Sequence, residues 1–532
     1  MLKEKLNIAI RVDANSEIGG GHFRRCLTLA QEAQKRGHSI KFISAQLPEK
    51  DRLLLKKNKL FYDIISEKNQ NENITSKKIP NKFSHDKWLK LSILEDAKIT
   101  SKSLDKFNPN WIIFDHYSLN IEWVNIVKKK HNDPYYLAID DLDNRKLGSD
   151  FLLDQTSIIK KERIYKVPGS LVGPKFALIS NKFDYYRNKS IQKRSDSKSF
   201  ILKNKNFFIL ISLGLYDKKK LLPILVDTLS KMKNATILVA TSSECQTLST
   251  LKKLCQKYKN FSLHLDSKNM AELMLKADVC IGASGMSMWE RCCMGIPSLT
   301  ITIAKNQQKV TKQVTNLNIS KQLRISVLKN KKKLLKTISD FIYSPKKLQQ
   351  LSENSYKICD GKGTDKVINF LEANLKKVEI KDSFKLLSWR NKKFIRANSL
   401  NKQKINTKSH DRWMEKTQNF KRGIWLIYSE GGKEIGHCSS IYVNKEVVYW
   451  SFYIGEPKFS PGSGIRMLVF FIKKLFFEIG ISKIEANVTI ENCKSQKLHK
   501  ELGFSLNSSN DHFQKYSLTK DFFKKRYYSN IE

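Results

Sequence analysis

The residues best suited to chemistry in the first part of the chain lie between Arg11 and Arg25. Three consecutive glycines, Gly19, Gly20 and Gly21, precede His22, and a helical pattern follows. Glycines at a strand-to-helix turn let backbone N–H groups approach a ligand, and the helix N-terminus favours an anion. The helix dipole disfavours a protonated imidazole, so a neutral His22 could accept a proton. A simple hydrogen-bonding cap is the alternative role for His22.

A second loop of small residues lies in the middle of the chain. The run Gly282-Ala-Ser-Gly285 follows an apolar strand and leads into a helix that carries Ser287 and Glu290. Such a loop can cradle a diphosphate, and a carboxylate early in the helix can accept both hydroxyls of a ribose. Complementing the helix dipole is the alternative role for Glu290.

The last third of the chain carries two further motifs. The loop Phe459-Ser-Pro-Gly462-Ser463-Gly464 precedes a strongly apolar helix, and amides in such a loop can hold a pyrophosphate. The second motif, Asn492-x-x-Ser-x-x-Leu-His499, ends at Gly503-Phe504. Asn492 could bind a cofactor or cap the helix.

These motifs need strands and helices to position them, and the patterns predict three blocks. In the first two, apolar strands alternate with helices, which predicts parallel sheets covered on both faces. In the third, alternating strands form an antiparallel meander, which predicts an α+β domain. The strands are expected at 6–12, 39–44, 111–115, 135–140 and 151–153, at 207–212, 235–240, 261–265, 279–281 and 298–303, and at 423–429, 434–443, 447–454 and 483–488. The main helices are expected at 23–36, 288–294, 331–342, 345–357, 364–377, 389–400, 465–478 and 493–502.

The domain boundaries follow from shifts in composition. We expect a first Rossmann-like half at 1–186, a polar linker at 187–199, a second Rossmann-like half at 200–377 and a final domain at 378–532. The fold class is therefore α/β, with two Rossmann-like halves followed by an α+β domain.

Composition narrows the class of protein. The chain has 532 residues, a formal charge of +46 and nine cysteines without CxxC spacing. The charge favours anionic partners in general, although much of it reads as solvated lysine. The cysteines are expected to be reduced and mostly buried, with neither a disulfide framework nor a zinc site. Without a signal peptide or a long apolar run, the sequence predicts a cytoplasmic protein with no membrane span and no metal.

The first two blocks resemble a known family over roughly residues 6–310. Arg11-x-Asp13, Ile18-Gly-x-Gly-His22 and Phe114-Asp-His-Tyr117 resemble the nucleotide-sugar hydrolase of pseudaminic acid biosynthesis. So do the segments that end in Glu290 and in Asn306-Gln307. That enzyme acts on UDP-2,4-diacetamido-2,4,6-trideoxy-β-L-altropyranose and has the GT-B arrangement of two Rossmann-like halves.

The resemblance implies roles for individual residues. His22 would be the general base for water, and attack at the anomeric carbon opposite UDP would invert its configuration. Tyr117 and Asn306 are expected near the sugar as catalytic residues. The substrate would be bound by Gly19–Gly21, Gly285, Ser287, Glu290 and Gln307. Asp13 is either structural or a sugar-hydroxyl contact, and Asp140-Asp141 is either a carboxylate pair or a strand-end turn.

One segment departs from the family pattern. The Gly-Gly-Ser-Asp-like turn of the family reads Gly214-Leu215-Tyr216-Asp217 here. Leu215 and Tyr216 would crowd a loop where glycine normally lets the backbone approach a ligand.

The last block resembles the GNAT acetyltransferases over about 380–520. The resemblance implies that acetyl-CoA is a co-substrate, with Gly462, Ser463, Gly464 and Asn492 in its site. His499 stands where many relatives have a tyrosine general acid, so it could protonate the leaving thiolate; simple packing is the alternative. The segments Leu387-Ser-Trp389-Arg390-Asn391 and His410-x-x-Trp413 resemble the acetyltransferase of the same pathway, which modifies a UDP-4-amino-sugar. Trp389 and Trp413 could instead be core residues.

Together the blocks predict a bifunctional enzyme that acetylates a UDP-4-amino-sugar and hydrolyses the diacetamido product to release UDP. Two other functions stay open. One is a GT-B glycosyltransferase with a sugar or lipid acceptor. The other is a basic scaffold or nucleic-acid-binding protein with degenerate sites, although nucleic acid is the less expected partner.

Overall fold

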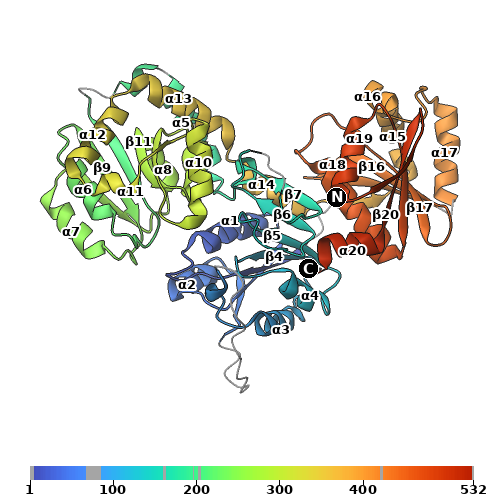
Figure 1. Ribbon diagram of the computed structural model, residues 1–532, viewed down its shortest axis with the longest axis horizontal. Helices are drawn as coiled ribbons and strands as arrows, with labels where there is room; N and C mark the ends of the chain where they lie inside the picture. Colours follow the sequence, from blue (N-terminus) through green and yellow to red (C-terminus); the bar gives the residue numbers. More distant parts are fainter. Residues whose placement is uncertain are drawn as a thin grey trace.

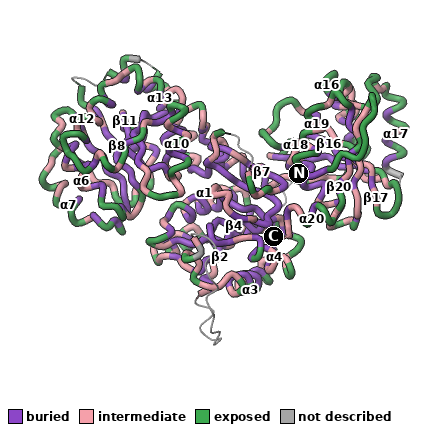
Figure 2. Tube along the Cα trace, viewed as in Figure 1, coloured by how far each residue is buried: buried purple, intermediate pink, exposed green. Residues whose placement is uncertain are grey.

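The computed structural model describes residues 5–66, 85–159, 163–195, 197–201, 205–419 and 423–529. Three sheets with their helices form three lobes, and the first half lies between the other two (Figure 1). Two parallel Rossmann-like sheets are followed by a mixed sheet, which confirms the predicted fold class. Figure 2 shows buried residues along the strands and exposed residues along outer helices such as α7 and α17.

The first half is a seven-stranded parallel sheet in the order β3-β2-β1-β4-β5-β6-β7. Its strands are almost continuously apolar because helices cover both faces. The strands are β1 (Asn7–Val12), β2 (Ser39–Ser44), β3 (Phe61–Ile64), β4 (Trp111–Asp115), β5 (Tyr135–Ile139), β6 (Phe151–Asp154) and β7 (Gly169–Val172). The helices are α1 (Gly21–Lys35), α2 (Glu49–Lys57), α3 (Ile93–Leu104) and α4 (Ile121–Lys128), with 3-10 turns η1 (Asp86–Trp88) and η2 (Pro174–Phe176).

The second half is a six-stranded parallel sheet in the order β10-β9-β8-β11-β12-β13. Its strands are β8 (Phe207–Ser212), β9 (Ala235–Thr241), β10 (Phe261–Leu265), β11 (Val279–Ala283), β12 (Ser298–Ile301) and β13 (Lys321–Gln322). Its helices are α6 (Leu222–Leu229), α7 (Leu248–Lys257), α8 (Met270–Lys276), α9 (Ser287–Cys293), α10 (Gln308–Asn316), α11 (Ile325–Leu328), α12 (Lys331–Ile342) and α13 (Pro345–Ile358), with the turn η4 (Lys305–Gln307).

Two helices connect the halves. Residues 187–195 of the expected linker belong to α5 (Lys182–Ser195), the turn η3 (Ser197–Phe200) follows, and residue 196 lies outside the described residues. The helix α14 (Gly363–Leu371) crosses back and packs on α1 of the first half. Arg36 anchors it through Asp365 at 2.6 Å, and the indole of Trp111 donates to the carbonyl of Leu371 at 3.0 Å.

The third domain has the sheet order β14-β15-β16-β17-β18-β20-β19. Its pairs are antiparallel except β17 and β18, which run parallel and pair only over Val447–Tyr449 before they separate. The strands are β14 (Asn374–Lys377), β15 (Gly423–Glu430), β16 (Lys433–Tyr442), β17 (Val447–Ile454), β18 (Lys483–Thr489), β19 (Ser505–Ser509) and β20 (Phe513–Thr519). The helical segments are η5 (Ile380–Asp382), α15 (Ser383–Arg390), α16 (Lys393–Ala397), α17 (Thr407–Asn419), α18 (Ser463–Lys473), η6 (Lys474–Ile479), α19 (Cys493–Leu502) and α20 (Lys520–Tyr528).

Two predicted helices differ from the structure. The helix expected at 364–377 ends at Leu371, and Asn374–Lys377 is an edge strand that pairs with β15. The alternation of that short segment was hidden by the preceding helical pattern. The helix expected at 389–400 is two short helices that meet near Arg390.

The third domain and the first half share one hydrophobic core. Phe470 of α18 lies against Tyr135, Phe151 and Phe370, with ring centroids 4.7, 5.0 and 6.0 Å away. Beside it, the buried carboxylate of Asp150 accepts hydrogen bonds from Lys473 at 2.6 Å and from the hydroxyl of Tyr528 at 2.7 Å. The third domain is therefore fixed to the first half by packing as well as by the chain connection.

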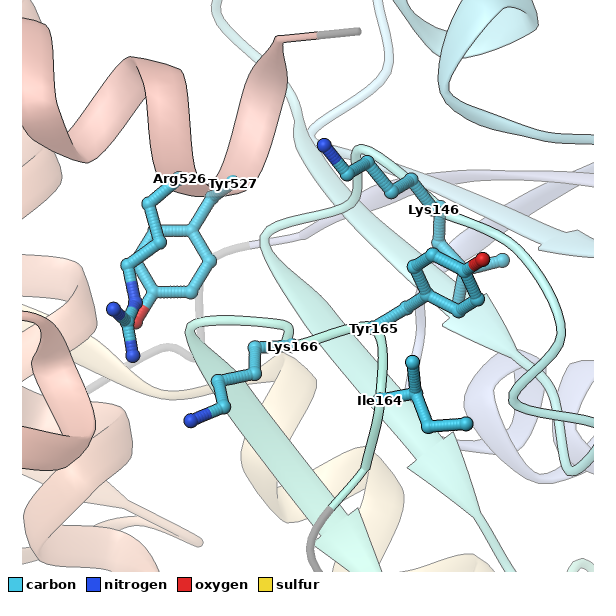
Figure 3. A pocket seen from close by; sticks show the side chains of 7 residues that line it. Lys146, Ile164, Tyr165, Lys166, Arg526 and Tyr527 are labelled. Carbon is cyan, nitrogen blue, oxygen red and sulfur yellow. The ribbon is translucent and has the colours of Figure 1, made fainter. Parts of the chain in front are cut away.

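A cavity of about 200 Å³ remains at the edge of this seam. Figure 3 shows Lys146, Ile164, Tyr165 and Lys166 of the first half on one side and two residues of α20, Arg526 and Tyr527, on the other. None of the residues in the motifs singled out above lines it.

We expect Phe470→Ala to destabilise the first half and the third domain together, because the ring is buried in their joint core. Truncating a buried phenylalanine costs about 3–5 kcal/mol. Urea unfolding and hydrogen exchange should show lost protection in both β6 and α18. Phe522→Ala is the control because this ring is 42% exposed. Unchanged protection in β6 would contradict a shared core.

Candidate functional site

The centre of the first half is a buried carboxylate, Asp115, that contacts two side chains of α1. The Nδ1–H of His22 donates to Oδ1 of Asp115 at 2.6 Å. The guanidinium of Arg25 donates to both carboxylate oxygens at 2.5 Å. Asp115 is the last residue of β4, which pairs with β1, so the loop that follows β1 and the carboxylate lie side by side.

The charges around Asp115 determine the tautomer of His22. Burial opposes ionisation of Asp115, but Arg25 and His22 outweigh it and lower the pKa of this carboxyl well below its usual range. A permanently ionised carboxylate can only accept, so Nδ1 of His22 carries the hydrogen and Nε2 keeps its lone pair. The arrangement of a carboxylate that orients an imidazole is suited to general-base chemistry.

Aromatic rings surround His22. The ring of Tyr117 lies edge-on to His22 with centroids 4.6 Å apart, and Trp88 stacks on Tyr117 at 5.5 Å. The hydroxyl of Tyr117 donates to Asp141 at 2.6 Å. Burial and the nearby Asp141 raise the pKa of Tyr117 well above its usual value, so this hydroxyl stays protonated. Tyr117, which the resemblance implies to be near the sugar, therefore lies next to His22.

Asp13 and Asp140, for which the sequence left two roles open, are both bonded to neighbouring protein groups. The fully buried carboxylate of Asp13 accepts from Arg11 at 2.6 Å and from the backbone N–H of Ala45 at 2.7 Å. Asp140 accepts from the backbone N–H of Leu142 at 3.1 Å and pairs with Arg145 at 2.8 Å. These contacts match the structural alternative for Asp13 and the turn alternative for Asp140, so substrate binding by Asp13 has no support here.

The glycine loop contacts the second half. Gly19 has φ of +83°, and Gly21 begins α1. A Cβ on Gly20 would lie 2.5 Å from Cδ1 of Leu215, which follows β8 of the second half. The leucine that departs from the family pattern is thus accommodated by the missing side chain of Gly20, and the loops after β1 and β8 meet across the cleft.

The second small-residue loop lies beside that contact, because β11 and β8 are neighbours in the sheet. Ser284–Met286 connects β11 to α9, where Ser287 accepts a hydrogen bond from Arg291 at 3.1 Å. Burial raises the pKa of Glu290 to about 7, although Arg291 opposes the shift. A carboxylate that is costly to ionise in the empty protein would be stabilised by two ribose hydroxyls.

Two further residues expected at the substrate, Asn306 and Gln307, lie in the turn η4. The amide nitrogen of Gln307 lies 3.6 Å from where a Cβ of Gly285 would stand, and its Oε1 accepts from the N–H of Ile303 at 3.1 Å. Asn306 precedes it in the turn η4 and is half-buried. Gln307 and Gly285, both expected to bind the substrate, therefore lie close together.

A cavity of about 410 Å³ opens between the two halves. The first half contributes Ala14–Ser16 and Gln46–Pro48, and the second half contributes Tyr216, Glu244 and Gln246. Lys50 forms an ion pair with Glu244 across the same gap. The lining begins one residue after Asp13 and does not include His22 itself.

In the third domain, a buried arginine supports the predicted cofactor loop. Gly462 has φ of +87° and caps α18, and Gly464 lies in its first turn. Arg466 donates to the carbonyl of Pro461 at 3.0 Å and to the hydroxyl of Ser463 at 2.8 Å. Its other partner is Glu430, at 2.6 Å. The side chain of Ser463 is therefore engaged with the protein.

The catalytic role of His499 is wrong. Its Nδ1–H donates to the carbonyl of Ser495 at 2.8 Å, and its Nε2 accepts from the indole N–H of Trp450 at 3.1 Å. Burial lowers the pKa of His499 to about 4, so the ring is neutral and its one N–H is already engaged by the carbonyl of Ser495. The packing alternative holds because the ring is enclosed by aromatic residues, among them Tyr516 at 5.3 Å.

Asn492 has the helix-capping role that the sequence left open beside cofactor binding. Its Oδ1 accepts from the N–H of Ser495 at 3.1 Å and so caps α19. Its Nδ2 donates to the carbonyl of Asn398 at 3.3 Å. Trp389 and Trp413 belong to or pack against one apolar cluster, in agreement with the core alternative for both.

Sequence reasoning did not single out Asp115, Arg25 and Trp88 as site residues. A carboxylate at the end of the strand beside β1 was a usable signal for Asp115, and a residue one turn after His22 was a signal for Arg25. Trp88 had no signal, because it reaches the site from a separate segment.

The group around His22 and the loop around Gly462 lie on different sides of the first half. His22 and Asp115 lie at the carboxyl ends of β1 and β4, whereas Phe470 of α18 packs on Tyr135 and Phe151, the first residues of β5 and β6. Figure 1 shows the second half and the third domain on opposite sides of the first half.

The described residues contain neither a membrane-spanning helix nor a metal-binding group. No helix there is long and apolar enough to cross a membrane. No group of three or more histidines, cysteines, aspartates or glutamates is arranged there to hold a metal ion.

Two curated proteins are similar in sequence. The uncharacterized protein MJ1062 of Methanocaldococcus jannaschii is 25% identical over 538 aligned residues, which cover 94% of this chain and 96% of that protein. The spore coat polysaccharide biosynthesis protein SpsG of Bacillus subtilis is 25% identical over 167 residues, or 31% of this chain and 49% of that protein.

Two solved structures are similar in fold. MurG of Acinetobacter baumannii covers 69% of this chain and 99% of its own, with 14% identity and a TM-score of 0.48. The N-acetyltransferase PseH of Campylobacter jejuni covers 28% of this chain and 98% of its own, with 16% identity and a TM-score of 0.23. Residues 374–505 match the family described as an acetyltransferase (GNAT) domain. The end of the chain is therefore a GNAT acetyltransferase domain that uses acetyl-CoA, as the sequence predicted.

Proposed function

We propose that the first two halves hydrolyse a UDP-sugar at its anomeric carbon and that the third domain N-acetylates the 4-amino precursor of that sugar. The substrate of the hydrolase is UDP-2,4-diacetamido-2,4,6-trideoxy-β-L-altropyranose, as the resemblance to the pseudaminic acid hydrolase implies. Both reactions belong to the making of one free diacetamido sugar in the cytoplasm. The similarity to a polysaccharide biosynthesis protein supports this general setting.

The observation that carries the proposal is the contact of His22 with Asp115, which Arg25 holds in place. Nε2 of His22 takes a proton from water while the water oxygen forms a bond to the anomeric carbon. The bond from that carbon to the phosphate oxygen breaks, and its electron pair leaves with UDP. Asp115 stabilises the imidazolium that forms, and attack from the face opposite UDP inverts the carbon.

The second half holds the leaving group. Backbone N–H groups of the loop around Gly285 face the diphosphate, and the carboxylate of Glu290 accepts the ribose hydroxyls. Asn306 and Gln307 contact the sugar from the turn η4. Because UDP is a good leaving group, the site needs no strong general acid.

Acetylation precedes hydrolysis, because the hydrolase substrate already carries the acetyl group. The two sites lie on different sides of the first half, so the acetylated UDP-sugar reaches His22 through solvent. Fusion in one chain then provides the two active sites in equal numbers. It does not transfer the intermediate directly from one site to the other.

We expect His22→Ala to lower UDP release from the diacetamido UDP-sugar by about 10²–10⁴-fold while UDP still binds, because only the base is removed. Release of UDP without any sugar acceptor, followed by mass spectrometry, is the measurement, and calorimetry with UDP is the control for the intact site. Normal turnover in the variant would remove the proposed base. Turnover that needs an added acceptor would indicate a glycosyltransferase instead.

We expect Gly20→Ala to weaken hydrolysis by pushing Leu215 away. The backbone of Gly20 has φ of −91°, so alanine is not strained there and only the contact changes. Overpacking of this kind costs about 1–3 kcal/mol, which corresponds to a KM for the UDP-sugar raised about tenfold. The double variant Gly20→Ala/Leu215→Ala should recover most of the loss, and Leu215→Ala alone is the control. Without recovery, closure of the two halves at this contact is refuted.

We expect UDP affinity to rise about tenfold between pH 6 and pH 8, because Glu290 accepts ribose hydroxyls as a carboxylate and its pKa is raised to about 7. Below pH 7 the protonated carboxyl loses one acceptor. Calorimetry with UDP at several pH values measures this, and Glu290→Gln corrects for the titration of UDP itself. Equal pH slopes in the two proteins would exclude the role of Glu290.

A further inference from the structure

Several polar side chains of the third domain have a buried atom without a hydrogen-bond partner, and two of these side chains, His437 and the half-buried Arg390, belong to one group. Nε2 of His437 and Nη1 of Arg390 have no partner among the described residues, and His437 is only 4% exposed. Tyr453 is associated with both residues. Its ring stacks on His437 with centroids 5.2 Å apart, and burial raises the pKa of its hydroxyl while the positive charge of Arg390 opposes that rise. Unpartnered polar atoms in such a place are costly unless a ligand satisfies them.

These side chains lie next to the place where β17 and β18 separate. His437 of β16 is directly opposite Tyr453 of β17 in the antiparallel register. The pairing of β17 with β18 stops at Tyr449, so Tyr453 belongs to the stretch of β17 that β18 no longer covers. The chain then runs directly into the acetyl-CoA loop that ends at Gly462. An acetyl group entering along this free edge comes close to His437.

The other histidines of the third domain do not fit a proton acceptor. Both ring nitrogens of His499 are engaged, and Nε2 of His410 is bonded to the carbonyl of Ser383 at 2.9 Å. His512 is exposed in a turn before β20. His437 alone among the four combines burial with an unpartnered ring nitrogen.

We propose that Arg390, His437 and Tyr453 form the acceptor site of the third domain and that His437 takes the proton of the attacking amine. The proposal rests on the proposed function, since it assigns the site of that N-acetylation. The amine nitrogen forms a bond to the carbonyl carbon of the thioester, and the carbon–sulfur bond breaks with its electron pair on sulfur. Nε2 of His437 receives the proton from nitrogen, and the thiolate of CoA takes a proton from water.

The charge of the site selects the class of acceptor. Arg390 provides a cation for a phosphate, and the ring of Tyr453 provides a flat apolar surface for a sugar. Burial also keeps His437 neutral, since it lowers the pKa of this ring to about 4. An amino sugar that carries a nucleoside diphosphate fits these features, whereas a polyamine would be repelled by Arg390.

The test uses the full chain with acetyl-CoA and the UDP-4-amino-sugar, and it measures thiol release and the mass of the product. We expect His437→Gln to lower kcat at least 100-fold and to leave the KM for acetyl-CoA within twofold. Arg390→Gln should raise the KM for the UDP-amino-sugar at least tenfold without changing the KM for acetyl-CoA. His512→Gln is the matched control in the same domain, and spermidine in place of the UDP-amino-sugar should give no thiol release.

The possible outcomes distinguish an error in the assigned substrate from an error in the role of His437. No transfer by the wild-type chain would overturn the substrate assignment. Wild-type transfer with His437→Gln within threefold of it would overturn the role of His437 alone. Hydrolysis of the diacetamido UDP-sugar and the urea midpoint report whether each variant is folded. If His437→Gln does not fold, an unchanged KM for the UDP-amino-sugar in Arg390→Gln would still refute the site.

Discussion

The hydrogen bond from His22 to Asp115 is the interaction on which the catalytic account depends. It exists because β1 and β4 are adjacent parallel strands, so the loop after one meets the last residue of the other. Arg25, one turn along α1, keeps the carboxylate ionised although it is fully buried. A buried charge is stable only when it is paired in this way. The same pairing fixes which nitrogen of His22 can accept a proton.

The arrangement of the domains adds a second constraint. The second half reaches the glycine loop through Leu215, while α14 returns to α1 and the third domain packs on the opposite end of the first sheet. The first half is therefore in contact with both the second half and the third domain. Helix α18 is fixed to the first half through Phe470 and Lys473.

The sequence predicted what depends on local pattern. The strands Trp111–Asp115 and Val447–Ile454 and the helix Cys493–Leu502 have the predicted bounds, because apolar periodicity and their capping residues define them. Contacts between distant segments were not predictable in the same way. The sequence pattern around a helical histidine is the same whether its ring faces a substrate or, like that of His499, is bonded to Ser495 and Trp450. Similarly, nothing local indicated that Leu215 would fit over Gly20.

The most direct test of the chemistry follows the oxygen of water. In water enriched in ¹⁸O, a single turnover of the diacetamido UDP-sugar should place the label on the anomeric carbon of the free sugar and none in UDP, because His22 directs water at carbon. Mass spectrometry of both products distinguishes the two positions. Label in UDP would mean attack at phosphorus, and the assignment of His22 as the base for attack on the sugar would then be wrong.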